Sequence, residues 1–259
     1  MKNFTIFLLM LLPVFASAQS EGFEARWFTR SGETLPYRLL PPAGYNAGKA
    51  YPLIIFMHGI GERGNDNEKQ LLHGSQLFLN DSLRQQFPAF VIFPQCADNA
   101  TWAPMMVQQD SSGNRSFHFP ASLPPTAPSR LLYKLIDSLM ASGSVDTKRL
   151  YVGGMSMGGM GTFDMLARFP SRFAAAFPIC GAGNEKLAKR YAKNTAVWIF
   201  HGAEDKLVPP TSSRKFYENL KDRGADVKYT EYPGVGHNSW DNVFAEPELF
   251  PWLFSHQLK

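Results

Sequence analysis

The chain has 259 residues, of which 44% are hydrophobic and 19% charged, the balance of an ordinary globular protein. This composition excludes an intrinsically disordered chain, a collagen, a coiled coil and a small disulfide-stapled domain. The net charge is +4 and the basic residues are scattered along the chain. The sequence therefore predicts no nucleic-acid partner and no stable membrane anchor, and it leaves the oligomeric state open.

The first 18 residues have the three parts of a secretion signal. Lys2 supplies a positive charge, residues 6–15 form an apolar core, and residues 16–18 form a small-residue cleavage site. The apolar run is too short to span a bilayer as a helix. We expect cleavage after Ala18 and a periplasmic or secreted protein. Residues 19–259 are long enough for one large α/β domain with a buried core.

The predicted elements follow one another in a regular order. Two strands at 22–29 and 34–40 can pair as an antiparallel hairpin. Short, continuous apolar runs follow, which are typical of parallel strands covered by helices on both faces. These strands are 53–57, 90–93, 150–152, 174–179 and 197–200, with an alternating strand at 227–232. Helices are predicted at 68–81, 129–141, 157–169, 210–223 and 247–257. The order predicts a doubly wound α/β fold with a mostly parallel, twisted sheet.

Residues 97–128 do not fit this alternation. The segment contains five prolines and several large apolar side chains but no clear periodicity. A long irregular stretch in a compact domain is usually functional or mobile. It leaves the sheet at the edge where doubly wound folds carry their sites. We therefore expect a lid-like or pocket-wall insertion, with Trp102 and Trp240 as aromatic substrate contacts; the alternative is that these aromatics only pack the loop onto the domain.

Cofactor and metal motifs are not found in the sequence. Two cysteines, Cys96 and Cys180, are too few for a disulfide framework, and we expect both to be buried reduced thiols. The chain has no H-E-x-x-H motif and neither of the two common glycine-rich nucleotide motifs. We expect neither a metal nor a cofactor.

Residues 154–158, Gly-Met-Ser-Met-Gly, match the G-x-S-x-G nucleophile elbow. The match follows a predicted strand and precedes a predicted helix, which is the setting that such an elbow requires. Ser156 must adopt a strained backbone conformation to project its hydroxyl group, and glycine neighbours let the strand and helix approach closely. Ser156 is therefore the candidate nucleophile.

A serine nucleophile needs a base and a carboxylate that orients the base. Among six histidines, His237 is the candidate base because it lies in a glycine-rich loop after the last predicted strand. The other five are assigned to strand ends (His58, His201) or to the surface or lid (His73, His118, His256). The carboxylate should follow a strand between the serine and the histidine. Asp205 is preferred there, with Glu204 as the alternative.

Stabilising the negative charge that forms during attack requires two backbone N–H groups. One should belong to Met157, the residue after the nucleophile. The other should come from the glycine-rich loop after the strand at 53–57. Ile60 is the first choice for this second donor, and Gly61 the alternative.

These motifs together resemble the α/β-hydrolase superfamily. Within it, the chain is similar to secreted carboxylesterases of the phospholipase/carboxylesterase, polyhydroxybutyrate depolymerase-like and prolyl-oligopeptidase-like group. The matching residues are His58-Gly59-Ile60-Gly61-Glu62-Arg63-Gly64, Gly154-Met155-Ser156-Met157-Gly158-Gly159, His201-Gly202-Ala203-Glu204-Asp205 and Gly236-His237. The resemblance implies an α/β-hydrolase fold, a Ser156–Asp205–His237 triad, an acyl-enzyme mechanism and no cofactor. The expected substrates are small-molecule or carbohydrate esters.

Two other functions stay open. The chain could be a small serine peptidase, although it lacks the propeller domain that gates peptides in prolyl oligopeptidases. It could also be a catalytically inactive binding module, against which the three triad residues in the expected order argue. The sequence favours ester hydrolysis.

Overall fold

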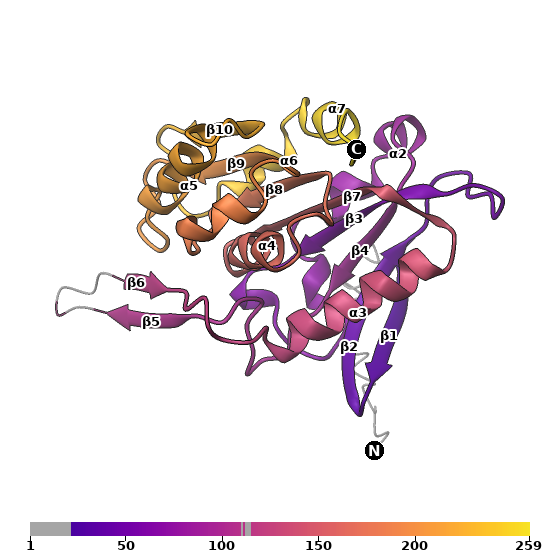
Figure 1. Cartoon of the computed structure of the whole chain (residues 1–259). Helices are drawn as coiled ribbons and strands as arrows, with labels where there is room; N and C mark the ends of the chain where they lie inside the picture. The colour runs from indigo at the N-terminus through magenta and orange to yellow at the C-terminus, as the bar shows by residue number, and fades with distance from the viewer. Residues whose placement is uncertain (1–21, 110, 112–114) are drawn as a thin grey trace, which may run out of the picture.

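The computed structural model describes residues 22–109, 111 and 115–259, and its central feature is an eight-stranded sheet (Figure 1). The predicted secretion signal lies outside the described residues. The sheet order is β1-β2-β4-β3-β7-β8-β9-β10. Its strands are β1 (Glu24–Arg30), β2 (Glu33–Leu40), β3 (Tyr51–Met57), β4 (Phe90–Pro94), β7 (Val145–Met155), β8 (Ala175–Ile179), β9 (Ala196–Gly202) and β10 (Val227–Tyr232). The helices are α1 (Ser75–Leu79), α2 (Asp81–Gln86), α3 (Ala127–Ala141), α4 (Met157–Arg168), α5 (Thr211–Lys221), α6 (Trp240–Phe244) and α7 (Leu249–Phe254).

The sheet is mostly parallel, as predicted. β1 and β2 form the expected antiparallel hairpin, and β2 also pairs antiparallel with β4. All the other neighbouring strands of this sheet pair in parallel. Parallel strands bring their carboxyl ends to one edge, and the loops after β3, β7, β8, β9 and β10 therefore meet there.

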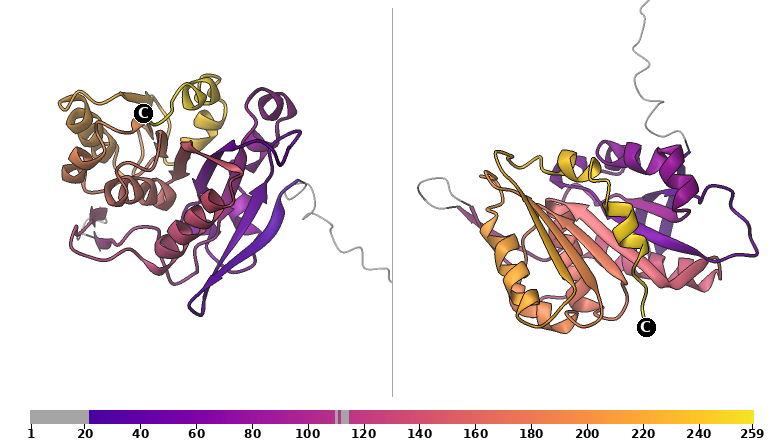
Figure 2. Two further views of the ribbon diagram at one scale, coloured as in Figure 1. Left: turned by 45° about the vertical axis from the view of Figure 1, so that its right-hand side comes forward. Right: turned by 90° about the horizontal axis from the view of Figure 1, so that it is seen from above.

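Helices cover both faces of the sheet (Figure 2). In β3, Leu53, Ile55 and Met57 belong to the core cluster that includes residues of α3, α4 and α5. Ile54 and Phe56 belong to the cluster that includes residues of α1, α6 and α7. Both faces of β3 are thus buried, which explains why its sequence is continuously apolar.

The predicted helix at 68–81 is wrong, because the chain breaks twice there. A 3₁₀ turn at Lys69–Leu71 is followed by the separate helices α1 and α2. Gly74 has a φ of 82°, a conformation that favours glycine. A Cβ atom at this position would lie 2.8 Å from the Phe244 ring, so α6 packs directly on the break.

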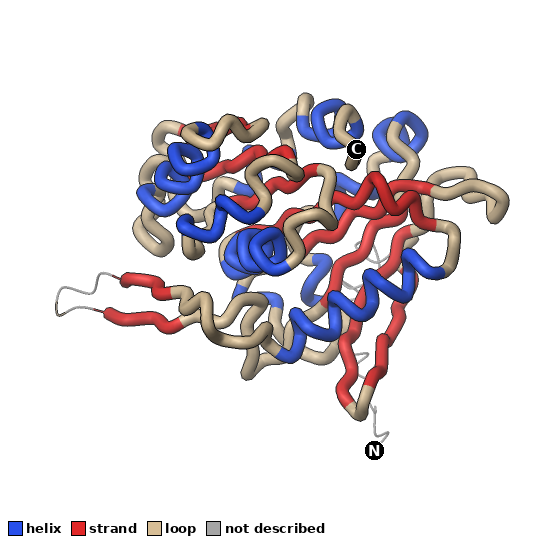
Figure 3. Tube along the Cα trace, viewed as in Figure 1, coloured by secondary structure: helices blue, strands red, loops and turns tan. Residues whose placement is uncertain are grey.

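Residues 97–128 contain a hairpin that periodicity did not predict. β5 (Met106–Gln109) and β6 (Arg115–His118) form a separate antiparallel sheet. This hairpin projects from the body of the molecule as an arm (Figure 3). Cys96 and Cys180 are buried free thiols. Among the described residues, the structure shows no helix of the length and hydrophobicity needed to cross a bilayer.

Candidate active site

The predicted elbow joins β7 to α4. Ser156 lies between them with φ 54° and ψ −115°, a strained conformation for a residue with a side chain. A Cβ atom at Gly158 would overlap the Met57 carbonyl group, and one at Gly154 would lie 2.6 Å from the same oxygen. The two glycines therefore allow β3, β7 and α4 to meet beneath Ser156.

The structure brings the three predicted triad residues together. The Nε2 atom of His237 lies 2.9 Å from Ser156 Oγ, and its Nδ1 atom lies 2.7 Å from Asp205 Oδ2. An ionised carboxylate accepts hydrogen bonds only, so Nδ1 carries the proton and Nε2 accepts from the serine hydroxyl. The alternative carboxylate, Glu204, is exposed and no hydrogen bond to His237 is found for it.

Four hydrogen-bond donors surround the carboxylate of Asp205. The backbone N–H groups of Leu207 and Val208 both donate to Oδ1, at 2.9 Å. His237 donates to Oδ2, and His201 Nε2 lies 3.2 Å from the same oxygen. Burial raises the pKa of Asp205, but the hydrogen bonds from both histidines and from Val208 outweigh it and hold the pKa well below its usual range. Asp205 is therefore ionised at neutral pH.

His201 contacts the triad carboxylate, a function that the sequence analysis missed. Its side chain is fully buried. The Nε2 atom lies 2.8 Å from the Val208 carbonyl oxygen and must carry a proton, so Nδ1 accepts from the Ser213 hydroxyl at 2.7 Å. His201 thus links α5 to Asp205. The His-Gly pair at the end of β9 was the only signal of this function in the sequence.

His58 is also buried, and it fixes the loop that follows β3. The Cys96 N–H donates to His58 Nε2 at 2.9 Å, so Nδ1 carries the proton and donates to the Gly59 carbonyl at 2.5 Å. Burial lowers the pKa of His58 to about 4, which keeps the ring neutral. A trans peptide group is planar, with its C=O and N–H opposed. By holding the Gly59 carbonyl, His58 also sets the direction of the Ile60 N–H.

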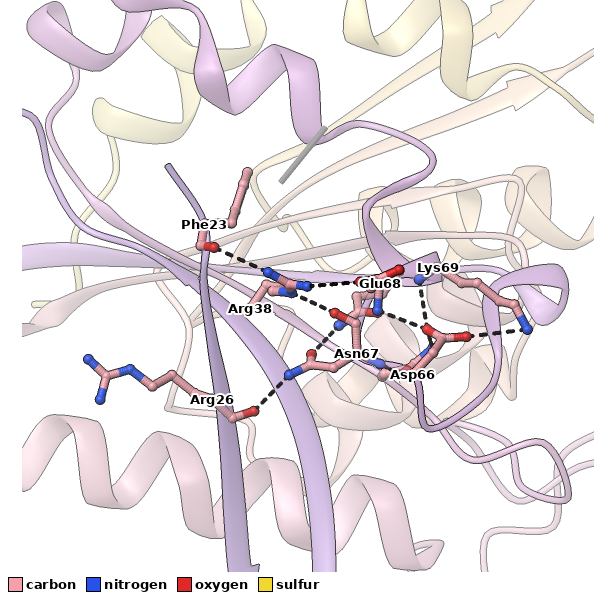
Figure 4. A network of polar contacts seen from close by, with 9 residues as sticks. Phe23, Arg26, Arg38, Asp66, Asn67, Glu68 and Lys69 are labelled. Atoms are coloured by element: carbon pink, nitrogen blue, oxygen red, sulfur yellow. Dashed lines mark hydrogen bonds and ion pairs between the residues drawn. The ribbon is translucent and has the colours of Figure 1, made fainter. Parts of the chain in front are cut away.

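A polar network holds the same loop against the edge of the sheet (Figure 4). Arg38 of β2 donates to the Asn67 carbonyl oxygen at 2.5 Å, and the Asn67 side chain donates to the carbonyl oxygen of Arg26 at 3.1 Å. Asp66 Oδ1 accepts from the backbone N–H of Lys69 at 3.0 Å. The loop that carries Ile60 is therefore held at its start by His58 and at its end by Asp66 and Asn67.

The candidate oxyanion donors lie beside the nucleophile. Met157 is the first residue of α4, where backbone N–H groups have no acceptor within the helix. A Cβ atom at Gly59 would lie 3.7 Å from the Ser156 Cβ atom, so the Ile60 loop borders the serine. Ile60 is 53% exposed, and a Cβ atom at Gly61 would meet no atom within 4 Å. The choice between Ile60 and Gly61 stays a prediction.

The two tryptophans expected at the substrate site have different environments. Trp240 is partly buried, with its ring centroid 5.5 Å from that of His237. Trp102 is fully buried, and its indole N–H donates to the His58 carbonyl oxygen at 3.1 Å. The prediction of Trp102 as a substrate contact is therefore wrong. Trp102 packs the start of the insertion against Gly161 of α4. A Cβ atom at Gly161 would lie 2.5 Å from the Cβ atom of Trp102.

The rest of the insertion does reach the neighbourhood of the triad. Ala103, Met160, Ala182 and Val208 form a small apolar cluster. Met160 lies one helical turn beyond Ser156, and Val208 binds Asp205 through its backbone. The partly buried side chains packed on this cluster come from both arms of the insertion: Met105, Phe117 and Phe119.

A strained serine elbow after β7, with its histidine and aspartate supplied by the loops after β10 and β9, defines an α/β-hydrolase. Comparison with known proteins agrees. Residues 45–247 match the phospholipase/carboxylesterase family, and the chain belongs to that family. It is an ester hydrolase.

The chain resembles several characterised proteins. It is 24% identical to an acyl-protein thioesterase 1 of Gibberella zeae over 238 residues, which cover 82% of this chain and 94% of that protein. It is 33% identical to a thermostable esterase of known structure, with a TM-score of 0.81, over 92% of this chain and 64% of that one. An acylaminoacyl peptidase shares the fold, with a TM-score of 0.60 and 20% identity over 92% of this chain and 42% of that chain.

Proposed function

We propose that the protein is a serine esterase that cleaves esters of small acyl groups or of carbohydrates through an acyl-enzyme intermediate. The observation that carries this proposal is the continuous hydrogen-bonded chain from Ser156 Oγ through His237 to Asp205. Family membership supports the same reaction class.

Each residue of the chain has a defined task in this mechanism. His237 Nε2 accepts the proton of Ser156 as Oγ attacks the ester carbonyl carbon. The backbone N–H of Met157 and that of Ile60 or Gly61 stabilise the oxyanion. His237 then donates the proton to the departing alcohol, which leaves the acyl group on Ser156. A water molecule, deprotonated by the same histidine, hydrolyses this ester and restores the serine.

The test is a panel of acetyl, butyryl and feruloyl esters with the purified protein. We expect turnover that Ser156→Ala and His237→Ala each reduce by several orders of magnitude. A serine-directed organophosphonate should label Ser156 at one equivalent. Because no step uses a metal, EDTA should not lower the rate. Labelling of another residue, or full activity in Ser156→Ala, would refute the proposal.

The alternative substrate is a peptide bond, which the same acyl-enzyme chemistry can cleave. A matched ester and amide of one acyl group separate the two. A peptidase also cleaves the more reactive ester, so the amide decides: we expect turnover of the ester and none of the amide, and turnover of the amide would make the protein a peptidase. An inactive binding module would turn over neither substrate.

We also propose that the insertion forms one wall of the substrate site, with Trp240 on another side. The support is the packing of Phe117 and Phe119 on the apolar cluster next to the triad. Phe117→Ala and Trp240→Ala should change the ranking of acyl groups while the melting temperature is kept. An equal loss on every ester would contradict this role.

The protein is proposed to be exported, with cleavage after Ala18. The support is the charge, apolar core and small residues of the first 18 positions. The mass of the protein recovered from the periplasm or medium tests this directly. An intact N-terminus in the cytoplasmic fraction would rule it out.

A further inference from the structure

Cys180 lies beside the triad in a position that ester hydrolysis does not use. It directly follows β8, and its free thiol is fully buried. The Cys180 Sγ atom, a carboxylate oxygen of Asp205 and a ring nitrogen of His237 all lie within 4.8 Å of one another. A thiolate, an imidazole and a carboxylate are the ligand types with which proteins bind Zn²⁺.

A second observation at the same place concerns Ser239. Its side chain is fully buried, and its hydroxyl oxygen has no hydrogen-bond partner of good geometry among the described residues. Its side chain lies near enough to Cys180 to interact with the thiol. A buried polar group without a partner is costly, and here it lies where it can donate to a thiolate. Ser239 thus adds a buried polar side chain next to Cys180.

We propose that Cys180, Asp205 and His237 form an inhibitory site for a thiophilic divalent cation, Zn²⁺ or its analogue Cd²⁺. The inference rests on the proposed function, because the cation would take the histidine that acts as the base. It is independent of which ester is the substrate.

Binding exchanges protons for the cation without any oxidation or reduction. As the two side chains become ligands, the Cys180 thiol releases one proton to solvent, and the Nδ1 proton of His237 moves to Nε2, so that the ring stays neutral. The cation then replaces the proton in the 2.7 Å contact between His237 and Asp205. The one proton of the ring then lies on Nε2. His237 can then no longer accept the proton of Ser156.

The ligand atoms must move relative to one another to bind the cation. At a tetrahedral angle, Zn–S and Zn–N bonds of about 2.3 and 2.1 Å place the sulfur and nitrogen atoms about 3.6 Å apart, within the 4.8 Å limit found for this group. The Nδ1 atom of His237 and the Oδ2 atom of Asp205, now 2.7 Å apart, must separate to admit the cation. The side chain of His237 is 18% exposed, whereas that of Asp205 is fully buried. His237 lies in the connection between β10 and α6. We therefore expect its side chain to move, and the cation to enter from the side of the molecule on which His237 is exposed.

The test titrates the purified full-length protein with Cd²⁺. Binding is followed by equilibrium dialysis and by the ultraviolet absorption of the Cd–thiolate bond, and hydrolysis is measured in parallel. We expect one equivalent of Cd²⁺, the thiolate absorption and loss of turnover. Cys180→Ser should lose the absorption. The inhibition constant of Cd²⁺, measured relative to the uninhibited rate of the variant, should rise by at least about 100-fold. Loss of an outer-shell partner costs up to about that much, and Cys180 is a direct ligand.

Cys96→Ser is the matched control, because Cys96 is the other buried free thiol. It should bind Cd²⁺ as the wild type does. If Cys180→Ser does not fold, Cys180→Ala and His237→Ala provide the same comparison, since dialysis and absorption need no activity. Thiolate absorption that persists without Cys180, or that Cys96→Ser abolishes, would overturn the proposal. Cd²⁺ binding through Cys180 in a protein without esterase activity would refute the proposed function and leave the metal site intact.

Discussion

Replacement of Asp205 by asparagine should inactivate the protein while the fold is retained. The side-chain amide has one acceptor oxygen and one donor nitrogen, whereas Asp205 accepts at both oxygens. The Oδ1 atom of Asp205 accepts hydrogen bonds from the backbone N–H groups of Leu207 and Val208, and a backbone N–H group can only donate. The amide oxygen must therefore take the Oδ1 position, and the NH₂ group must face His237.

This orientation determines the size of the effect. With an N–H donor opposite it, Nδ1 of His237 becomes an acceptor and the ring proton moves to Nε2. A protonated Nε2 cannot accept a proton from Ser156. The same wrong-tautomer change in a serine protease triad lowers kcat about 10⁴-fold, which corresponds to about 5.5 kcal/mol in the barrier. The two backbone hydrogen bonds survive and only the contacts of Oδ2 with His237 and His201 are lost, so the free energy of unfolding should fall less than it does in Asp205→Ala.

Three variants test this reasoning by steady-state ester hydrolysis and chemical unfolding. Asp205→Ala leaves the two backbone donors without an acceptor and should cost about 1–3 kcal/mol of stability for each of them, unlike Asp205→Asn. Glu204→Gln changes only an exposed side chain and should keep full activity. If Asp205→Asn stays within about tenfold of wild type, or Glu204→Gln is the inactive variant, the assignment of Asp205 is wrong.

Further predictions concern the residues around the site. Trp102→Ala removes a fully buried side chain and should lower the free energy of unfolding by about 3–5 kcal/mol; in ester assays it should not change the ranking of acyl groups. His58→Ala frees the Gly59 carbonyl and should lower kcat by up to about 10²–10³-fold, the cost of losing one oxyanion donor, with little change in KM. For Asp66, burial raises the pKa, but hydrogen bonds from the Lys69 N–H and neighbouring groups outweigh it and lower the pKa to about 2. Ionised Asp66 therefore stabilises the fold above its unfolded pKa, and this contribution is lost as pH falls from about 4 to about 2. Asp66→Asn should be less stable than wild type at pH 7, with melting temperatures that converge towards pH 2.

The elements that sequence analysis predicted well depend on local pattern. The elbow around Ser156 could be found because its glycines are required by backbone contacts that any chain of this fold must make. His237 and Asp205 could be placed because each follows a strand and parallel strands end at one edge. The strand at 227–232 has the predicted bounds, and apolar and polar residues alternate over its first four positions, 227–230.

The errors and omissions arise from contacts between residues far apart in the sequence. Trp102 was expected to face a substrate, because composition cannot distinguish an aromatic ring that lines a pocket from one that packs against Gly161. The function of His58 depends on a hydrogen bond from Cys96, which lies 38 residues further along the chain. Gly74 breaks a helical pattern only because the Phe244 ring packs on it.

The projecting hairpin bears on how this scaffold can diversify. Within the described residues, β5 and β6 pair only with each other, so their register is independent of that of the eight-stranded sheet. The root of the hairpin packs beside the triad, while Met106 and Val107 are each 50% exposed. If the insertion forms the proposed wall of the substrate site, changes in the arm should reshape that wall without changing the register of the eight-stranded sheet. Substrate preference could then change through a few surface residues of the arm while Ser156, His237 and Asp205 stay the same.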